Sequence, residues 1–230
     1  MARILLIETS TAQLTAALAE DGDVTASRIS AEPRMQASLT APFIKEIMDE
    51  KGLTFKDLNA VCVGKGPGSY TGLRVGVSTA KGLCFGAGLP LLAVGTLDTL
   101  VSEAHRLGVV PEGCRYIVPM VDARRMEVYA AVFTPDGRQL TETKPVIVDP
   151  DSFSAELADG SVLFIGDGAL KCRETLVSGN AHFAAAFPTA MAMAPLAEDA
   201  WTEKRFEDLA YFEPFYLKDF VATVSRKKLF

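Results

Sequence analysis

The amino-acid sequence predicts an α/β protein made of two similar lobes with a cleft between them. Runs of β-branched and aliphatic residues alternate with segments whose apolar residues recur at helical spacing. The order β-β-β-α-β-α occurs in the first half of the chain and is echoed in the second, and glycines follow the strands predicted at 60–63 and 162–165. The echo concerns element order and glycine positions, not sequence identity. A repeated α/β unit is typical of two lobes that face each other.

The first lobe is predicted from its periodicity and its turns. Glu20–Asp23 has the composition of a hairpin turn. Leu39, Phe43 and Ile47 repeat at helical spacing, and Gly52 stands where a helix C-cap belongs. The predicted elements are strands over 3–9, 14–19, 24–29, 60–63 and 89–94, a helix that contains Leu39, Phe43 and Ile47 and ends at Gly52, and a helix over 70–85.

The second lobe is predicted to repeat this order. Pro135–Gly137 is typical of a turn between strands, and Gly166–Ala169 is expected to open a helix. The predicted elements are strands over 116–121, 126–134 and 162–165, another strand ending near 148, and helices over 152–157 and from 166.

The length of 230 residues fits one domain or two lobes of about 100 residues each. We predict an N-terminal lobe over residues 1–107 and a smaller C-terminal lobe over residues 108–230, with the boundary at Gly108–Gly113. The last helix is expected to cross back to the first lobe.

Composition narrows the class of function. The net charge of −6 argues against a protein that grips nucleic acid by itself. The four cysteines form no C-x-x-C pair, which fits the reducing cytoplasm. No apolar run approaches the roughly 20 residues that span a bilayer. We therefore expect a cytoplasmic protein without a membrane association.

The most informative segment is the glycine-rich turn from Gly64 to Gly72, which joins a β-branched run to a helical pattern. Ser69 or Thr71 can cap the helix, and free N–H groups at a helix N-terminus favour an anion. The loop has neither the Walker pattern nor G-x-G-x-x-G. Phosphate binding and a tight connection without a ligand both remain open.

Loops that leave the first strand of each lobe face the predicted cleft. They are Glu8–Thr11 and Asp122–Arg125, and ligands of open α/β sheets gather beyond the carboxyl ends of strands. The charged residues of the second loop, Asp122, Arg124 and Arg125, can bind a phosphate-bearing ligand or form ion pairs, and ion pairs are favoured. The candidate nucleotide- or phosphate-binding residues are Glu8, Ser10, Gly66, Gly68 and Ser69.

Catalytic residues are not evident. His105 and His182 are isolated in sequence, so no zinc or iron motif is present and no metal site is predicted. Ser10 and Ser69 lack a G-x-S-x-G context and a nearby histidine base. A helix cap is favoured over a nucleophile for Ser69, and the candidate catalytic set is empty.

The helix after the glycine loop carries a strip of small residues, Gly72, Gly76 and Ala80. Glycine inside a helix costs about 1 kcal/mol relative to alanine, so a packing reason is needed. From these residues alone, packing against the chain's own sheet is favoured over a subunit contact.

Four stretches, in order and spread over nearly the whole chain, resemble the TsaB (YeaZ) family of tRNA threonylcarbamoyladenosine biosynthesis proteins. They are Ile4–Thr11, Val63–Arg74, Asp122–Tyr129 and Glu213–Lys218. The resemblance implies an actin-like, Hsp70-like duplication of the ribonuclease H fold. It also implies a non-catalytic subunit that supports a TsaD subunit, which transfers threonylcarbamoyl from its adenylate to the adenosine beside the tRNA anticodon. The alternative is a nucleotide-binding hydrolase or a peptidase-like enzyme of the same fold.

The resemblance also implies partners. These are TsaD and a small ATPase, TsaE, with a homodimer when the chain is alone and tRNA reached only through the complex. No cofactor is expected to bind tightly, although ATP or ADP at the subunit interface fits the family. TsaD-type proteins carry a metal-binding histidine pair, which this chain lacks.

Family dimers pair through the first-lobe helices, here 36–51 and 70–85. The resemblance therefore favours a subunit contact for Gly72, Gly76 and Ala80, in place of packing against the chain's own sheet. Two departures stand out: Glu8 where the family commonly has aspartate, and Lys218 where it has arginine. The glutamate makes a nucleotide–magnesium role less expected. The implied interface residues are Leu39, Phe43, Ile47, Gly72, Leu73, Gly76 and Ala80.

Overall fold

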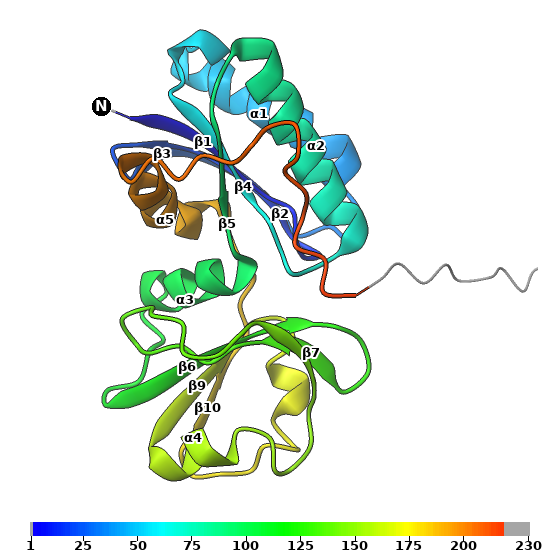
Figure 1. Ribbon diagram of the computed structural model, residues 1–230, viewed down its shortest axis with the longest axis vertical. Coiled ribbons are helices and arrows are strands. Elements are labelled where there is room, and N and C mark those ends of the chain that lie inside the picture. Colours follow the sequence, from blue (N-terminus) through cyan, green and yellow to red (C-terminus); the bar gives the residue numbers. More distant parts are fainter. Residues whose placement is uncertain (1, 219–230) are drawn as a thin grey trace, which may run out of the picture.

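The computed structural model describes residues 2–218 and contains two five-stranded sheets, one above the other in Figure 1. The strand orders are β3-β2-β1-β4-β5 and β10-β9-β6-β7-β8. The strands are β1 Arg3–Glu8, β2 Leu14–Glu20, β3 Asp23–Ser30, β4 Ala60–Gly64, β5 Leu91–Val94, β6 Cys114–Asp122, β7 Glu127–Ala130, β8 Lys144–Ile147, β9 Ser161–Ile165 and β10 Ala181–Ala184. The helices are α1 Gln36–Lys51, α2 Tyr70–Ala87, α3 Thr96–Arg106, α4 Ser154–Asp159 and α5 Ala190–Thr202, with short 3-10 helices η1 Phe55–Asp57 and η2 Leu170–Cys172.

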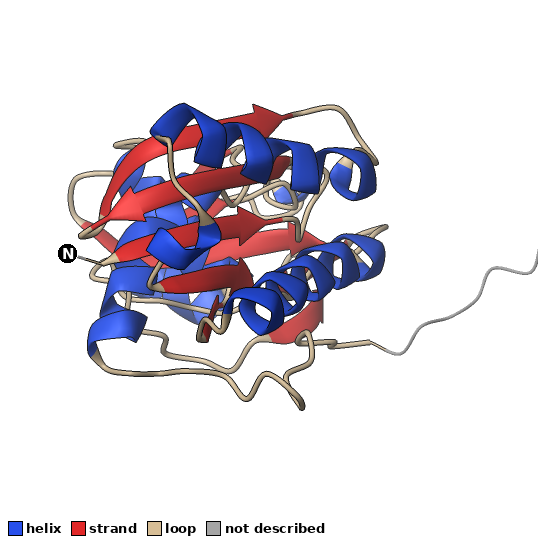
Figure 2. Cartoon of the chain, turned by 90° about the horizontal axis from the view of Figure 1, so that it is seen from above, coloured by secondary structure: helices blue, strands red, loops and turns tan. Residues whose placement is uncertain are grey.

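The first sheet is covered on both faces, which explains why β1 is an almost continuous apolar run. Helices α1 and α2 pack on one face through Ile44, Ile47, Val77 and Ala80. Helix α5 packs on the other face against alternate residues of the strands. Figure 2 shows the strands lying between helices. Both termini of α1, Gln36 and Lys51, coincide with the prediction.

The second sheet repeats the same topology. Strand β6 pairs antiparallel with β7 and parallel with β9, as β1 does with β2 and β4. The helix predicted from Gly166 is wrong, because only the 3-10 turn Leu170–Cys172 forms there. The second lobe therefore lacks a counterpart to α2.

Each lobe gives one helix to the other. Helix α3 follows β5 but packs on β6 and β9, whereas α5 follows β10 but packs on β1, β2 and β5 (Figure 1). Thr189 at the start of α5 donates to the buried carboxylate of Glu103 at 2.8 Å, and Arg106 donates to the same group. The sequence pattern did not predict α3 or β10, and the exchanged helices join the lobes through buried polar contacts.

Within residues 2–218, no helix is both long enough and apolar enough to cross a membrane.

Candidate functional site

The glycine loop and α2 lie against the chain's own segment that follows β1. A Cβ added at Gly68 would overlap the carbonyl oxygen of Ser10, and one at Gly72 would overlap that of Thr9. At Gly76 a Cβ would overlap the Thr9 hydroxyl, which donates to the Gly72 carbonyl at 2.8 Å. The glycines are therefore required by a close approach of backbone within the first lobe.

The same contact uses donors that an anion would need. The N–H of Ser69 donates to the Ser10 carbonyl at 2.6 Å, and the Gly72 N–H donates to the Ser69 side chain at 3.4 Å. Ser69 is thus the helix cap, as predicted. A phosphate bound by the Ser69 N–H would have to displace the Ser10 carbonyl, which disfavours an anion at this end of the loop.

Glu8 ends β1 and is fully buried. One carboxylate oxygen, Oε1, accepts the Ser10 N–H at 2.6 Å, and the other, Oε2, has no hydrogen-bond partner among the described residues. Oε2 lies against Gly64, where a Cβ would overlap it. Burial raises the pKa of Glu8 to about 7. A carboxylate held in this way faces the protein interior and is poorly placed to hold a magnesium ion in the cleft.

The corresponding place in the second lobe is occupied by Asp122 at the end of β6. Its carboxylate accepts from Lys171 and from the Arg124 N–H, while Asp167 accepts the Asp122 N–H at 2.9 Å. Burial raises the pKa of Asp167. Lys171 supplies the ion pair expected at Asp122, in place of Arg124 or Arg125, whose backbones adopt positive φ at the tip of the β6–β7 hairpin.

No serine–histidine pair forms in the described part of the chain. Ser10 is fully buried, and Ser69 caps α2. His105 Nε2 lies 2.6 Å from the carbonyl oxygen of Pro135, and His182 lies on β10 of the second sheet. Neither Ser10 nor Ser69 therefore has a histidine as hydrogen-bond partner among the described residues.

The structure places most of the predicted interface residues inside the first lobe. Ile47, Gly72, Leu73, Gly76 and Ala80 are buried there within the chain itself. This burial agrees with the interpretation based on the residues alone for Gly72, Gly76 and Ala80, and a subunit contact through these residues stays a prediction.

The side of α2 that faces solvent differs from that strip. We call Ser78, Gly82, Phe85 and Gly86 the outer α2 face, because they lie at helical spacing and are exposed. A Cβ at Gly82 or Gly86 would meet nothing within 4 Å, and Phe85 is 83% exposed. On neighbouring α1, Leu39 and Phe43 are only half-buried.

The segment Glu213–Lys218 connects the two lobes. The Phe215 N–H donates to the Lys65 carbonyl at 2.7 Å, and the Tyr216 ring lies 4.9 Å from that of Tyr70. Lys218 pairs with Glu127 of β7. Phe215 also lines a cavity of about 490 Å³ beside the glycine loop, together with Lys65, Asp98 and Glu142.

Two sheets of the same strand order, joined by exchanged helices, define a two-lobed protein of the actin-like, ribonuclease H-related class. A structure described as YeaZ from Pseudomonas aeruginosa superimposes with a TM-score of 0.82 and 25% identity, covering 94% of this chain and 100% of that one. An uncharacterized Pseudomonas aeruginosa protein with similarity to peptidase YeaZ gives a TM-score of 0.83 and 26% identity over 95% and 100% of the chains.

The sequence comparisons agree with that class and narrow it. The chain is 31% identical to the Escherichia coli tRNA threonylcarbamoyladenosine biosynthesis protein TsaB, over 96% of each chain, and 28% identical to the Haemophilus influenzae TsaB, over 98% and 96%. A family model described as "TsaD: tRNA N6-adenosine threonylcarbamoyltransferase" matches residues 33–224. The chain belongs to the TsaB family. The resemblance and the fold class that the sequence predicted are confirmed.

Proposed function

We propose that this chain is a non-catalytic subunit in tRNA threonylcarbamoyladenosine biosynthesis, which supports the TsaD-type subunit that transfers the threonylcarbamoyl group. Its similarity to proteins named TsaB over nearly the whole length carries this proposal. A TsaE-type ATPase would join the pair in the cytoplasm, and the chain would form a homodimer when alone.

The arrangement of the candidate site supports a role without catalysis. The serines of the loops are buried or used as a cap, and both histidines lie elsewhere. The N–H groups of Ser10 and Ser69 donate to Glu8 and to the Ser10 carbonyl, so neither is free for a nucleotide phosphate. These observations disfavour the alternative of a nucleotide-binding hydrolase or a peptidase-like enzyme. A nucleotide at the subunit interface stays a prediction from the family.

The outer α2 face is the best candidate for the partner contact. A glycine inside a helix costs about 1 kcal/mol relative to alanine. The chain's own packing does not require Gly82 or Gly86, since a side chain there would meet open space. A partner backbone that approaches α2 closely would explain why both positions are glycine. Phe85 adds an exposed aromatic side chain that can anchor the contact.

Gly82→Leu separates pairing from folding. Because leucine is the better helix former, the free energy of unfolding should stay equal or rise by up to about 1 kcal/mol. The bulky side chain should nevertheless prevent formation of the complex with TsaD, as measured by light scattering after size-exclusion chromatography. Ala155→Leu, at an exposed position of α4, is the matched control and should leave the complex intact.

Two results would count against the proposal. A complex of unchanged mass with Gly82→Leu would exclude the outer α2 face as the contact. Transfer by TsaD and TsaE that proceeds equally well without this chain would exclude the supporting role itself.

A further inference from the structure

The two sheets differ at one pair of equivalent edges. Strands β5 and β10 end the first and second sheets at corresponding places in the strand order. The edge of β5 is covered by the chain itself, because Glu207 forms an antiparallel bridge to Leu91 and its N–H donates to the Leu91 carbonyl at 2.8 Å. Lys81 of α2 donates to the carbonyls of Ala210 and Phe212 and fixes this covering segment.

The equivalent edge of β10 is not covered by any segment within residues 2–218. Asn180 and Ala184 direct their carbonyls to β9, accepting from Val162 at 2.9 Å and Gly166 at 3.2 Å. Because successive residues of a strand alternate, Phe183 directs its N–H and its carbonyl away from the sheet. Edge strand β8, in contrast, carries Lys144 and Pro145, which discourage pairing, and β10 has neither residue type.

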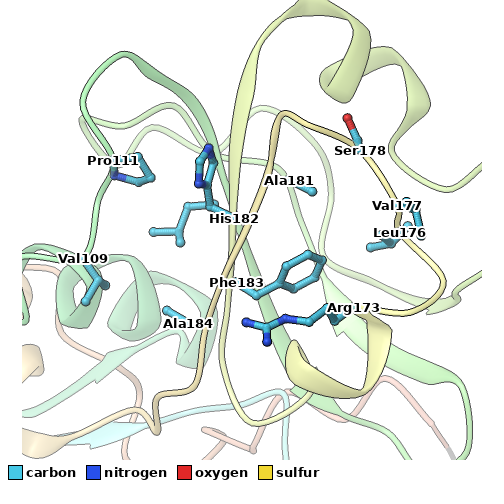
Figure 3. Close-up of a pocket in the computed structure, with 11 residues that line it drawn as sticks. Val109, Pro111, Arg173, Leu176, Val177, Ser178, Ala181, His182, Phe183 and Ala184 are labelled. Atoms are coloured by element: carbon cyan, nitrogen blue, oxygen red, sulfur yellow. The ribbon is translucent and has the colours of Figure 1, made fainter.

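A groove of about 640 Å³ runs along this open edge. Val109 and Pro111 lie on one side of β10, and the loop from Arg173 to Ser178 lies on the other (Figure 3). Val177 in that loop is 84% exposed. An extended chain placed here would reach the free backbone groups of Phe183 and apolar side chains on both sides.

The side chains that line the groove favour an acidic occupant. Arg173 and His182 are the ionisable residues among those that line it, and no acidic residue does. The Arg173 guanidinium lies 5.6 Å from the centre of the Phe183 ring, and the structure gives it no ion pair among the described residues. Arginine beside an open strand edge suits a carboxylate.

We propose that the β10 edge binds an extended, acidic segment of a partner protein, which adds to the second sheet as a further strand. The backbone of the segment would pair with Phe183, as Glu207 pairs with Leu91 on β5, and a glutamate or aspartate would meet Arg173. This site is separate from the outer α2 face, which belongs to the first lobe, so the proposal goes beyond the proposed function.

The test uses a blocked peptide of alternating valine and glutamate as the probe, added to the full chain. We expect saturable binding with a Kd below about 1 mM, measured by fluorescence anisotropy, and a shift of the Phe183 amide signal in NMR spectra. Arg173→Glu should weaken binding about tenfold or more, because a carboxylate then faces the acidic probe. Arg138→Glu, which makes the same charge change at another exposed position of this lobe, should leave binding unchanged.

Two further probes separate strand addition from charge attraction. A peptide with lysine in place of glutamate tests the charge, and one with N-methylated backbone amides tests the pairing. Absence of saturable binding at about 1 mM would overturn the proposal. Equal binding of either modified peptide would also overturn it, as would equal weakening by Arg138→Glu. If the chain forms a dimer and Arg173→Glu dissociates it, the occupant of the β10 edge is a second copy of this chain and not a partner protein, and the proposal is overturned.

Discussion

The two lobes share a strand order but use the same positions differently. At the end of the first strand, Glu8 is buried without an ion pair, whereas Asp122 is exposed and paired with Lys171. After the fourth strand, the first lobe forms the 18-residue helix α2, and the second forms only the three-residue turn η2. Two lobes with the same topology therefore do not have the same side-chain arrangement at the end of the first strand.

The glycines after the fourth strands show what the lobes do have in common. In the first lobe, Gly68 and Gly72 admit the backbone of Thr9 and Ser10. In the second, a Cβ at Gly166 would overlap the Met120 carbonyl, and one at Gly168 would lie 3.1 Å from the Asp122 N atom. In both lobes the glycines let the end of the first strand approach closely, and this need does not depend on an anion.

Gly72→Ala tests this explanation where the expected effect is largest. The added methyl group would overlap the Thr9 carbonyl, and backbone cannot move aside as a flexible side chain can. We expect a loss of about 3 kcal/mol or more in the free energy of unfolding, measured by urea denaturation. Gly86→Ala, on the exposed side of the same helix, should instead be neutral or stabilising by up to about 1 kcal/mol. Similar losses for both variants would show that helix propensity, not close approach, governs these positions.

Glu8→Gln tests the difference between the two strand ends. Burial raises the pKa of Glu8 from its ordinary value of 4.5 to about 7 in the folded protein, so the folded state favours the protonated form. The contribution of Glu8 to stability is therefore greatest below pH 4.5 and is lost as pH rises from about 4.5 to about 7, by about 3 kcal/mol. The Gln variant removes this loss, because its carbonyl still accepts the Ser10 N–H and no charge is buried.

The measurement is urea denaturation of both proteins at several pH values between about 4 and about 8, which bracket the two pKa values of Glu8. Asp122→Asn is the matched control at the corresponding, exposed position and should leave the pH dependence in place. Parallel pH profiles for wild type and Glu8→Gln would contradict the assignment.

Local sequence patterns predicted most strands of the first lobe, because their apolar runs and turn residues act over short distances. The existence of α1 and its C-terminal end followed from Leu39, Phe43, Ile47 and Gly52, whereas its start at Gln36 was given by the family resemblance. Helix α3 was missed although Leu97, Leu100, Val101 and Ala104 are buried at helical spacing. That repeat was a local signal for a helix and was overlooked, whereas the packing of α3 on the other lobe is a long-range contact that periodicity does not encode.

The candidate site was predicted less well, for the same reason. Glycine spacing marked the loop correctly, but the identity of the atom that each glycine faces depends on Thr9 and Ser10, which lie far earlier in the chain. The open groove beside Phe183 has no local sequence signal either, because it depends on the absence, within residues 2–218, of a covering segment like that of the first lobe. The sequence thus predicted which glycines have a special role, and the fold determined which atoms they contact.

Lys171→Met should have the smallest effect, and it sharpens the comparison from the side of the second lobe. Lys171 pairs with Asp122 and donates to the Glu127 carbonyl at 2.7 Å, but the Asp122 carboxylate is exposed, so solvent screens the pair. We expect a loss below about 1 kcal/mol in urea denaturation, reduced further at high salt. Arg205→Met removes another exposed ion pair, with Glu203, and should behave alike. A loss of several kcal/mol confined to Lys171→Met would show that solvent does not screen the Asp122–Lys171 pair, and Asp122 would then behave as a buried carboxylate, as Glu8 does.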